Sequence, residues 1–311
     1  VIVKGFEFKI GAMVPPMSTF LYPQMLWSEF VHVLGFLEER DLRSLGCTSL
    51  QGFTIQRREV NRRYGELGEG GPRFLSRRES AVGMVVTPNS ERLRLNDGRI
   101  LLSSYPRSGN SYLRGLLEGS TGIITGSDSR PNRNLSASLI RFGFQGEGVV
   151  DQSVWLVKSH YPERFGYARF EVGKAILLVR NPFDAIASYF NMAFTNTHDK
   201  VLHPSAREAP SPLAGIWEDF VLEEAGVWLR FHDFWGMKAR EMPVLTVRFE
   251  DLGPDSQEEL HAFLGCEGGG GGDTVLTKSS GAGYGPKAHT RSFGKALSLM
   301  SDLLVEKLQG V

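Results

Sequence analysis

The stretch Ser103-Ser-Tyr-Pro-Arg-Ser-Gly-Asn-Ser-Tyr-Leu113 joins an apolar run to a helical pattern. The preceding Arg99-Ile-Leu-Leu102 is typical of a buried strand, and the leucines of 113–117 follow the spacing of one helix face. A strand, a tight polar turn and a new helix leave backbone N–H groups unpaired, and these groups and the helix dipole favour an anion. Arg107 adds a cation whose fork suits phosphate or sulfate. The stretch therefore predicts an oxyanion cradle, with an ordinary strand-to-helix turn as the alternative.

The composition is that of a globular chain without net charge. Its 311 residues are 41% hydrophobic, enough for one large domain and a small one. Lys and Arg total 35, as do Asp and Glu, so the whole chain offers no attraction for nucleic acid or a membrane surface. Residues 40–107 are rich in arginine but lack the interleaved aromatic residues of a polynucleotide groove. We interpret them as a solvated basic face, and nucleic acid is not an expected partner.

The cysteines and histidines give no metal-binding pattern. Cys47 and Cys266 lie far apart and are interpreted as thiols of a reducing compartment, and no histidine pair has metal-ligand spacing. No apolar run approaches the roughly 20 residues of a membrane span, and no secretory signal is visible. We therefore expect no metal and a cytoplasmic location. The start at Val1 leaves open an upstream segment, such as a Golgi membrane anchor.

The apolar pattern divides the chain into three parts. Residues 1–66 are predicted to form a small helical module, because apolar residues between 20 and 64 recur at helical spacing. Residues 67–98, rich in Gly, Arg, Ser and Pro, are predicted to be a linker or an irregular loop. In 99–311 short apolar strands alternate with amphipathic helices. The predicted strands cover residues 99–104, 153–158, 175–180 and 243–248. Their near-continuous Val, Ile and Leu predict an α/β fold with a parallel sheet covered by helices.

Two further segments of the last part are predicted from their composition. The longest helix is expected at about 213–240, with an aromatic stripe that we assign to the core. Residues 265–285 contain nine glycines and are predicted to be a flexible loop or lid.

Open α/β sheets bind ligands at the carboxyl ends of their strands, and the second predicted strand ends in Lys158-Ser-His160. Pro162 discourages a helix there, so both Lys158 and His160 stay near the strand end. An unperturbed histidine has a pKa near 6.5, which makes His160 a candidate acceptor of a hydroxyl proton. A structural histidine, hydrogen-bonded at a strand end, is the alternative.

Charged residues also follow the third and fourth strands. In Arg180-Asn-Pro-Phe-Asp-Ala-Ile-Ala-Ser188, the Asn-Pro pair predicts the start of a helix. Arg180 then stands just before the helix and Ser188 about two turns into it, so both side chains can bind one phosphate. A strand-end ion pair and a neutral helix residue are the alternatives. In Arg248-Phe-Glu-Asp-Leu252, we expect Arg248 to pair with Glu250 or Asp251.

Together the four segments resemble the sulfotransferase family that uses 3′-phosphoadenosine-5′-phosphosulfate. Pro106 to Tyr112 resembles its 5′-phosphosulfate loop, and Lys158-Ser-His160 resembles the segment that holds its catalytic base. Arg180 to Ser188 has the same eight-residue step as its 3′-phosphate motif, and Arg248 to Leu252 is similar to its Arg-Tyr-Glu-Asp-Leu. With the continuation Arg114 to Ser127, the resemblance is closest to the sulfotransferase domain of WSC-domain-containing proteins. It covers about residues 99–252.

The resemblance implies a P-loop-like sulfotransferase fold and transfer of a sulfuryl group to an acceptor hydroxyl without a metal. His160 would be the general base, and Lys158 and Arg107 would be catalytic cations. The residues that it implies for the co-substrate are Arg107, Ser108, Gly109, Asn110, Ser111, Tyr112, Arg180 and Ser188. A glycan, a small molecule and a protein all remain open as acceptor, because variable loops form the acceptor pocket.

The chain departs from the family pattern at three places. Arg107 stands where cytosolic members carry lysine, and Phe249 replaces a tyrosine near the adenine. The family's later Arg-Lys-Gly loop has no clear counterpart, with Lys287 and Arg291 as candidate substitutes. Because arginine supplies charge but does not readily give up a proton, Arg107 is expected to act as a cation and not as an acid.

Residues 26–50 resemble an F-box in which Trp27 replaces the usual proline, with an ordinary helical hairpin as the alternative. Two rival functions therefore stay open. One is a non-enzymatic adaptor that recruits a ubiquitin-ligase scaffold through residues 20–64. The other is a nucleotide-binding kinase or NTPase, whose pattern GxxxxGK[ST] is absent because Gly109 stands alone and no lysine follows it.

Overall fold

The computed structural model describes residues 2–3, 6–7, 72–87, 92–94, 98–164, 166, 168–208, 210–267, 294–300 and 305. The chain divides into two compact units, residues 1–56 and 57–311. Of the first unit the structure describes the strands β1 (Ile2–Val3) and β2 (Phe6–Glu7), which pair antiparallel. The predicted helical module and its F-box-like segment lie outside the described residues, and so do most of the Gly-rich segment, Lys287 and Arg291.

The second unit is built on a five-stranded parallel sheet in the order β6-β7-β5-β8-β9. The strands are β5 (Arg99–Ser104), β6 (Gly126–Ser127), β7 (Leu156–Ser159), β8 (Val172–Val179) and β9 (Val244–Arg248). The predicted α/β class and its four strands are confirmed, although β7 begins later and β8 earlier than expected. The strand β6 was not predicted, because two residues are too short to show an alternating pattern.

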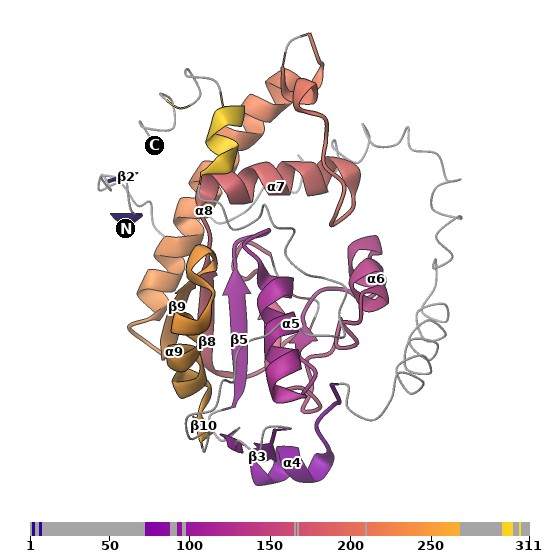
Figure 1. Cartoon of the computed structure of the whole chain (residues 1–311), viewed down its shortest axis with the longest axis vertical. Coiled ribbons are helices and arrows are strands. Elements are labelled where there is room, and N and C mark those ends of the chain that lie inside the picture. Colours follow the sequence, from indigo (N-terminus) through magenta and orange to yellow (C-terminus); the bar gives the residue numbers. More distant parts are fainter. Residues whose placement is uncertain are drawn as a thin grey trace. The chain divides into compact units, whose positions relative to one another are not determined.

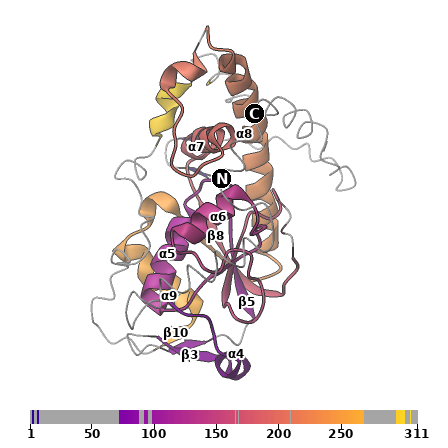
Figure 2. The ribbon, with the colours of Figure 1, turned by 90° about the vertical axis from the view of Figure 1, so that its right-hand side faces the viewer.

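Helices cover both faces of this sheet. They are α5 (Asn110–Thr121), α6 (Asn134–Arg141), α7 (Pro182–Thr195), α8 (Leu213–Lys238) and α9 (Pro254–Leu264), with the 3₁₀ turns η3 (Pro204–Arg207), η4 (Phe249–Asp251) and η5 (Lys295–Leu299). Figure 2 shows α5 and α9 on one side of the sheet and α8 on the other. The strands β5, β7 and most of β8 are therefore buried on both sides, whereas the edge strand β9 is only partly buried.

The side chains of the central strands alternate between two apolar clusters. Leu101, Ala175 and Leu177 belong to the cluster with α7 and α8, whereas Leu102 and Ile176 belong to the cluster with α5 and α9. Because successive strand side chains point to opposite faces, both faces need apolar residues. This explains why the sequence shows continuous Val, Ile and Leu there instead of polar alternation.

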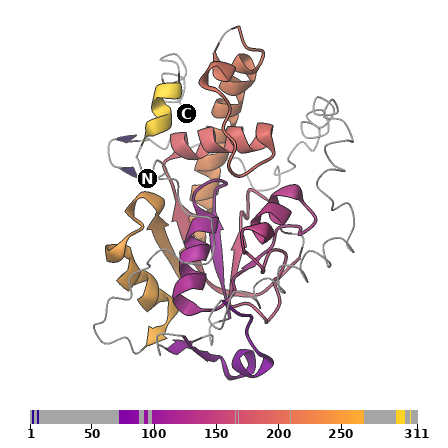
Figure 3. The same ribbon diagram turned by 45° about the vertical axis from the view of Figure 1, so that its right-hand side comes forward.

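The helix α7 begins directly after β8 because its first turn is well capped. The Asn181 side chain accepts a hydrogen bond from the Asp184 backbone N–H at 3.3 Å, and Pro182 is the first helical residue. The Asp184 carboxylate in turn accepts hydrogen bonds from two backbone N–H groups, that of Gly294 just before η5 and that of Ala296 within it, each at 2.8 Å. In Figures 1 and 3 α7, the helix that contains Ser188, lies across the upper ends of the strands.

The irregular structure predicted for 67–98 is wrong for the part that the structure describes. It contains α4 (Arg77–Val82) and the strands β3 (Met84–Val86) and β4 (Arg92–Arg94), which form an antiparallel sheet with β10 (Cys266–Glu267). Ser76 and Glu79 form a capping box at the start of α4, and this pattern was visible in the sequence. Val85 and Leu93 are buried against the cluster of α5 and α9, so this segment packs on the α/β core.

The long helix α8 confirms the predicted span but shifts its buried face. Trp217 and Phe231 are buried as expected, whereas Ile216 is 37% exposed and Trp235 is buried instead. The aromatic stripe thus belongs to the core. Over the described residues, no helix combines the length and the apolar character that crossing a membrane requires.

Candidate active site

Three loops meet at the carboxyl edge of the sheet. Ser103 of β5 pairs with Ser159 of β7 on one side and with Leu177 of β8 on the other, all in parallel. The loops that follow these strands begin at Tyr105, His160 and Arg180, and they contain the residues singled out in the sequence. The edge therefore collects charged residues that lie far apart in the chain, as expected for an open α/β sheet.

The loop after β5 is shaped by two left-handed residues. Arg107 has φ 66° and Gly109, the N-cap of α5, has φ 95°. A Cβ atom at Gly109 would overlap the Phe249 ring, so the turn requires glycine for its space as well as its backbone angle. The first N–H groups of any α-helix lack an intrahelical acceptor, and no side chain caps the first turn of α5.

Two further groups of this loop show what it can hold. Ser108 is fully buried, and its Oγ has no hydrogen-bond partner among the described residues. Ser111 lies half-buried in the first turn of α5. Free N–H groups and an unpartnered hydroxyl at a helix start form a site for an anion such as a phosphate.

Arg107, Arg180 and Ser188 come together across two loops. The Arg107 Nε donates to the Ser188 Oγ at 3.0 Å, and the Arg180 Nη1 donates to the Arg107 carbonyl at 2.8 Å. The Arg180 guanidinium also lies over the Phe249 ring, 5.0 Å from its centroid. Burial lowers the pKa of Arg180, the carboxylates of Asp184 and Glu250 oppose this effect, and the charge of Arg107 adds to it. Two cations thus share one small region of the edge.

Phe249 connects the residues of this region. Its ring lies against Gly109, makes an edge contact with Tyr112 at 6.1 Å between centroids and carries Arg180 on its face. Arg248 pairs with Asp251 at 3.1 Å, as expected, whereas Glu250 accepts the Asn181 backbone N–H at 2.8 Å. The strand end of β9 therefore supports the cradle from one side.

His160 is held in one orientation at the end of β7. Its Nδ1 lies 2.7 Å from the Ser104 carbonyl, and a carbonyl only accepts, so Nδ1 carries the proton. The unprotonated nitrogen of the neutral ring is then Nε2. Burial and, after it, the charge of Lys158 hold the pKa of His160 well below its usual value. The ring is therefore neutral at pH 7, with Nε2 as its lone-pair nitrogen.

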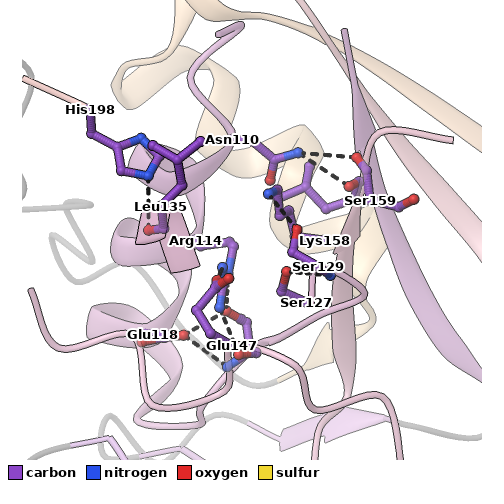
Figure 4. A network of polar contacts seen from close by, with 12 residues as sticks. Asn110, Arg114, Glu118, Ser127, Ser129, Leu135, Glu147, Lys158, Ser159 and His198 are labelled. Atoms are coloured by element: carbon purple, nitrogen blue, oxygen red, sulfur yellow. Dashed lines mark hydrogen bonds and ion pairs between the residues drawn. The ribbon is translucent and has the colours of Figure 1, made fainter. Parts of the chain in front are cut away.

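Lys158 lies in the polar network shown in Figure 4. Its Nζ donates to the Ser129 Oγ at 3.3 Å, and burial lowers the pKa of its ammonium group while Glu147 and Asp128 raise it. Asp128 accepts a hydrogen bond from the Ser159 Oγ at 2.5 Å. The network fixes the start of the loop that carries His160.

The Asn110 side chain braces two strand ends instead of pointing away from the sheet. Its Nδ2 donates to the Ser104 Oγ at 3.0 Å and lies 3.5 Å from the Ser159 carbonyl. The Asn110 Nδ2, in a residue predicted to touch the co-substrate, is therefore engaged within the protein. The amide ties β5 to β7.

A fully buried ion pair holds α5 to the segment before β7. Arg114 and Glu147 are both inaccessible to solvent and pair directly (Figure 4). Arg114 also donates from Nε to the Thr125 Oγ1 at 2.8 Å, and the Thr125 backbone N–H donates to Glu118 at 2.9 Å. Sequence reasoning missed this network, since its members are separated by many residues and share no motif.

A second polar cluster, also missed, lies beside the loop of His160. The Tyr105 hydroxyl donates to Glu224 of α8 at 2.5 Å, and burial raises the pKa of Glu224 to about 7. Glu163 pairs with Arg164 at 3.2 Å, and Arg164 bonds the Tyr189 hydroxyl. Tyr105 is adjacent to the predicted loop, but its partner on α8 carries no sequence signature.

The described residues contain no group of three or more His, Cys, Asp or Glu side chains placed to hold a metal ion. The charged groups at the edge are mainly cations with a neutral histidine among them. Such a site can bind a polyanion and accept a proton.

Comparison with known proteins gives a consistent picture. A family model described as a sulfotransferase domain matches residues 97–271. A WSCD family member of Drosophila pseudoobscura is 34% identical over 163 residues, 52% of this chain and 48% of that protein. Sulfotransferase 1 family member D1 of Rattus norvegicus is 26% identical over 184 residues, 53% of this chain and 57% of that protein. The matches span about half the length of these relatives.

A solved structure is also similar. The mouse sulfotransferase SULT7A1, complexed with PAP, aligns with 69% of this chain and 82% of its own at 17% identity and a TM-score of 0.42.

The buried ion pair gives a test of how the site is supported. Glu147→Gln is expected to lower the free energy of unfolding by about 3 kcal/mol, because Arg114 is left buried without its counter-ion. Chemical denaturation measures the effect. Glu241→Gln is the control, since Glu241 pairs with Lys238 on the surface and its loss should change little. Equal effects of the two changes would show that the Arg114–Glu147 pair is not buried as described.

Proposed function

Because the chain belongs to the sulfotransferase family, we propose that it transfers a sulfuryl group from 3′-phosphoadenosine-5′-phosphosulfate to a hydroxyl group of an acceptor. One observation carries the proposal. The loop after β5, in which Arg107 and Gly109 have a left-handed backbone, lies at the same sheet edge as Arg180 and His160. The loop and the arginines suit an anion, and the His160 Nε2 can accept a proton.

The residues of the edge fit such a donor. The free N–H groups at the start of α5 and the unpartnered Ser108 hydroxyl suit the 5′-phosphosulfate end. Arg180 and Ser188 are assigned to the 3′-phosphate, which a guanidinium can bind with two hydrogen bonds. Phe249 is buried and supports these groups, with Arg180 over its ring and Gly109 against it. When bound, the donor would supply the sulfuryl group and a bisphosphate leaving group.

His160 is assigned as the general base. Its Nδ1–H is fixed on the Ser104 carbonyl, so Nε2 is the atom that would take the proton of the acceptor hydroxyl. The lowered pKa keeps the ring unprotonated before the reaction. Holding the ring in one orientation also reduces the entropy that must be lost on reaching the reactive geometry.

Lys158 and Arg107 are assigned to charge stabilisation. Both lie at the ends of adjacent strands, and each is held by a hydroxyl: Lys158 by Ser129 and Arg107 by Ser188. Cations fixed in place before the reaction stabilise developing negative charge without reorganising. A guanidinium has donors but no acceptor, so the role assigned to Arg107 is that of a fixed charge.

Arg180 can be tested by comparing two ligands. Arg180→Ala should weaken adenosine 3′,5′-bisphosphate at least tenfold, but adenosine 5′-phosphate much less, because the side chain is assigned to the 3′-phosphate. Isothermal titration calorimetry gives both affinities. Arg248→Ala is the matched control, as Arg248 ends the next strand but pairs with Asp251. Equal weakening of both ligands would remove Arg180 from the 3′-phosphate site.

His160→Ala tests the assignment of the base. Turnover measured with labelled sulfate should fall by roughly 10²–10⁴, while affinity for the bisphosphate stays nearly unchanged, because the base contacts the acceptor. His261→Ala, on α9, should leave turnover unaltered. Normal turnover in a folded His160→Ala protein would exclude His160 as the base.

The acid side of the pH profile gives a separate test of the same residue. An ordinary histidine base would lose activity as the pH falls through 6.5. The pKa of His160 is lowered by burial and by Lys158, so His160 stays neutral at lower pH. Turnover should therefore persist between pH 8 and pH 6, and a fall centred near 6.5 would contradict the lowered pKa.

A further inference from the structure

His198 contacts Arg107 although it belongs to none of the matched motifs. It follows α7, beyond the helix end at Thr195, and its ring lies between Arg107 and the helix α6. The Arg107 Nη1 is 3.1 Å from the His198 Nδ1, and Nη2 donates to the His198 backbone carbonyl at 2.9 Å. One residue thus holds both terminal nitrogens of the guanidinium.

The partners of the ring determine its tautomer. The His198 Nε2 lies 3.1 Å from the Leu135 carbonyl, which only accepts, so Nε2 carries the proton. Nδ1 then carries the lone pair and faces Arg107, which only donates. Burial and, after it, the charge of Arg107 lower the pKa of His198 to about 4. The ring is neutral near pH 7 and accepts the hydrogen bond from Arg107.

The other contacts of the Arg107 side chain come from α7 and not from its own loop. The Arg107 backbone is in the left-handed region, and its side chain reaches α7 through Ser188 at 3.0 Å and Met192 at 3.7 Å. A flexible arginine loses much side-chain freedom when it is fixed. Residue 198 provides two of the acceptors that offset this loss.

We propose that His198 is a positioning residue that fixes the Arg107 guanidinium beside Ser188, through the lone pair of Nδ1. It acts through Arg107 and contacts neither donor nor acceptor. By holding Arg107 against α7, His198 joins the 5′-phosphosulfate loop to the helix that carries the 3′-phosphate serine. The inference rests on the proposed function for the identity of the bound bisphosphate, but the contact between His198 and Arg107 exists in the protein without a ligand.

A histidine that merely joins α6 to the segment after α7 would behave differently. Its essential bond would be the one to Leu135, through Nε2. Asparagine separates the two roles, because its carbonyl oxygen takes the place of Nδ1 but its side chain is too short to reach Leu135. His198→Asn should therefore keep the hydrogen bond from Arg107 and lose the hydrogen bond to the Leu135 carbonyl of α6.

Calorimetry with adenosine 3′,5′-bisphosphate tests the proposal in the whole chain. His198→Ala should weaken binding about tenfold, the size expected for one hydrogen bond to a charged group. His198→Asn should stay within about threefold of the wild-type affinity. In Arg107→Ala protein, adding His198→Ala should cause no further loss. His203→Ala is the control, because the ring of His203 bonds Ser205 on the surface.

Several outcomes would overturn the proposal. These are a His198→Ala affinity equal to wild type, an asparagine variant as weak as the alanine variant, or additive losses in the double mutant. Imidazole ¹⁵N chemical shifts of the ligand-free protein give an independent reading. A protonated Nε2 and an unprotonated Nδ1 support the proposal, and a protonated Nδ1 refutes it. If the wild-type protein binds no bisphosphate, the proposed function fails, while the ¹⁵N shifts still decide the contact between His198 and Arg107.

Discussion

Parallel pairing brings the ends of β5, β7 and β8 to one edge, because Ser103 pairs with both Ser159 and Leu177. Every feature of the site depends on this register. A strand shifted by one residue would turn its side chains to the opposite face of the sheet. The buried amide of Asn110 reinforces the register by reaching from α5 to the ends of β5 and β7. The same sheet that forms the core thus sets the positions of the charges.

The edge brings three cations together, with carboxylates near two of them: Asp184 and Glu250 act on Arg180, and Glu147 and Asp128 act on Lys158. Arg107 and Arg180 are neighbours, and Arg180 is held by a carbonyl and an aromatic face. Lys158 is buried beside a serine hydroxyl. Neighbouring cations in a partly buried site favour an anionic ligand, because the ligand relieves repulsion that folding has imposed. A preformed site of this kind also needs little rearrangement when it binds.

Much of this could be predicted from the sequence, for identifiable reasons. Four of the five strands of the sheet were visible because two-sided burial favours unbroken apolar runs. The start of α7 was visible because Asn181 and Pro182 are local signals. The meeting of the loops after β5 and β8 followed from their position at the carboxyl ends of neighbouring strands, whereas the contact of Arg107 with Ser188 was not predicted. The exact buried face of α8 did not follow, since aromatic residues occupy several sides of that helix.

Contacts between distant, motif-free residues could not be predicted. The pairs Arg114–Glu147 and Tyr105–Glu224 join segments that share no pattern, and His198 reaches Arg107 only because the chain turns back after α7. The segment 72–87 was misjudged for another reason. Its Ser76–Glu79 capping box is a local signal, but the surrounding Gly, Arg and Ser suggested a linker.

The central claim is that this edge binds a 3′-phosphorylated adenine nucleotide. The most direct measurement compares the stability of the whole chain with adenosine 3′,5′-bisphosphate and with ATP and Mg²⁺. At about 100 times its dissociation constant, the bisphosphate should raise the free energy of unfolding by roughly 2.7 kcal/mol, and ATP should raise it less at the same concentration. Equal or greater stabilisation by ATP with Mg²⁺ would contradict the account and favour a nucleoside triphosphate site.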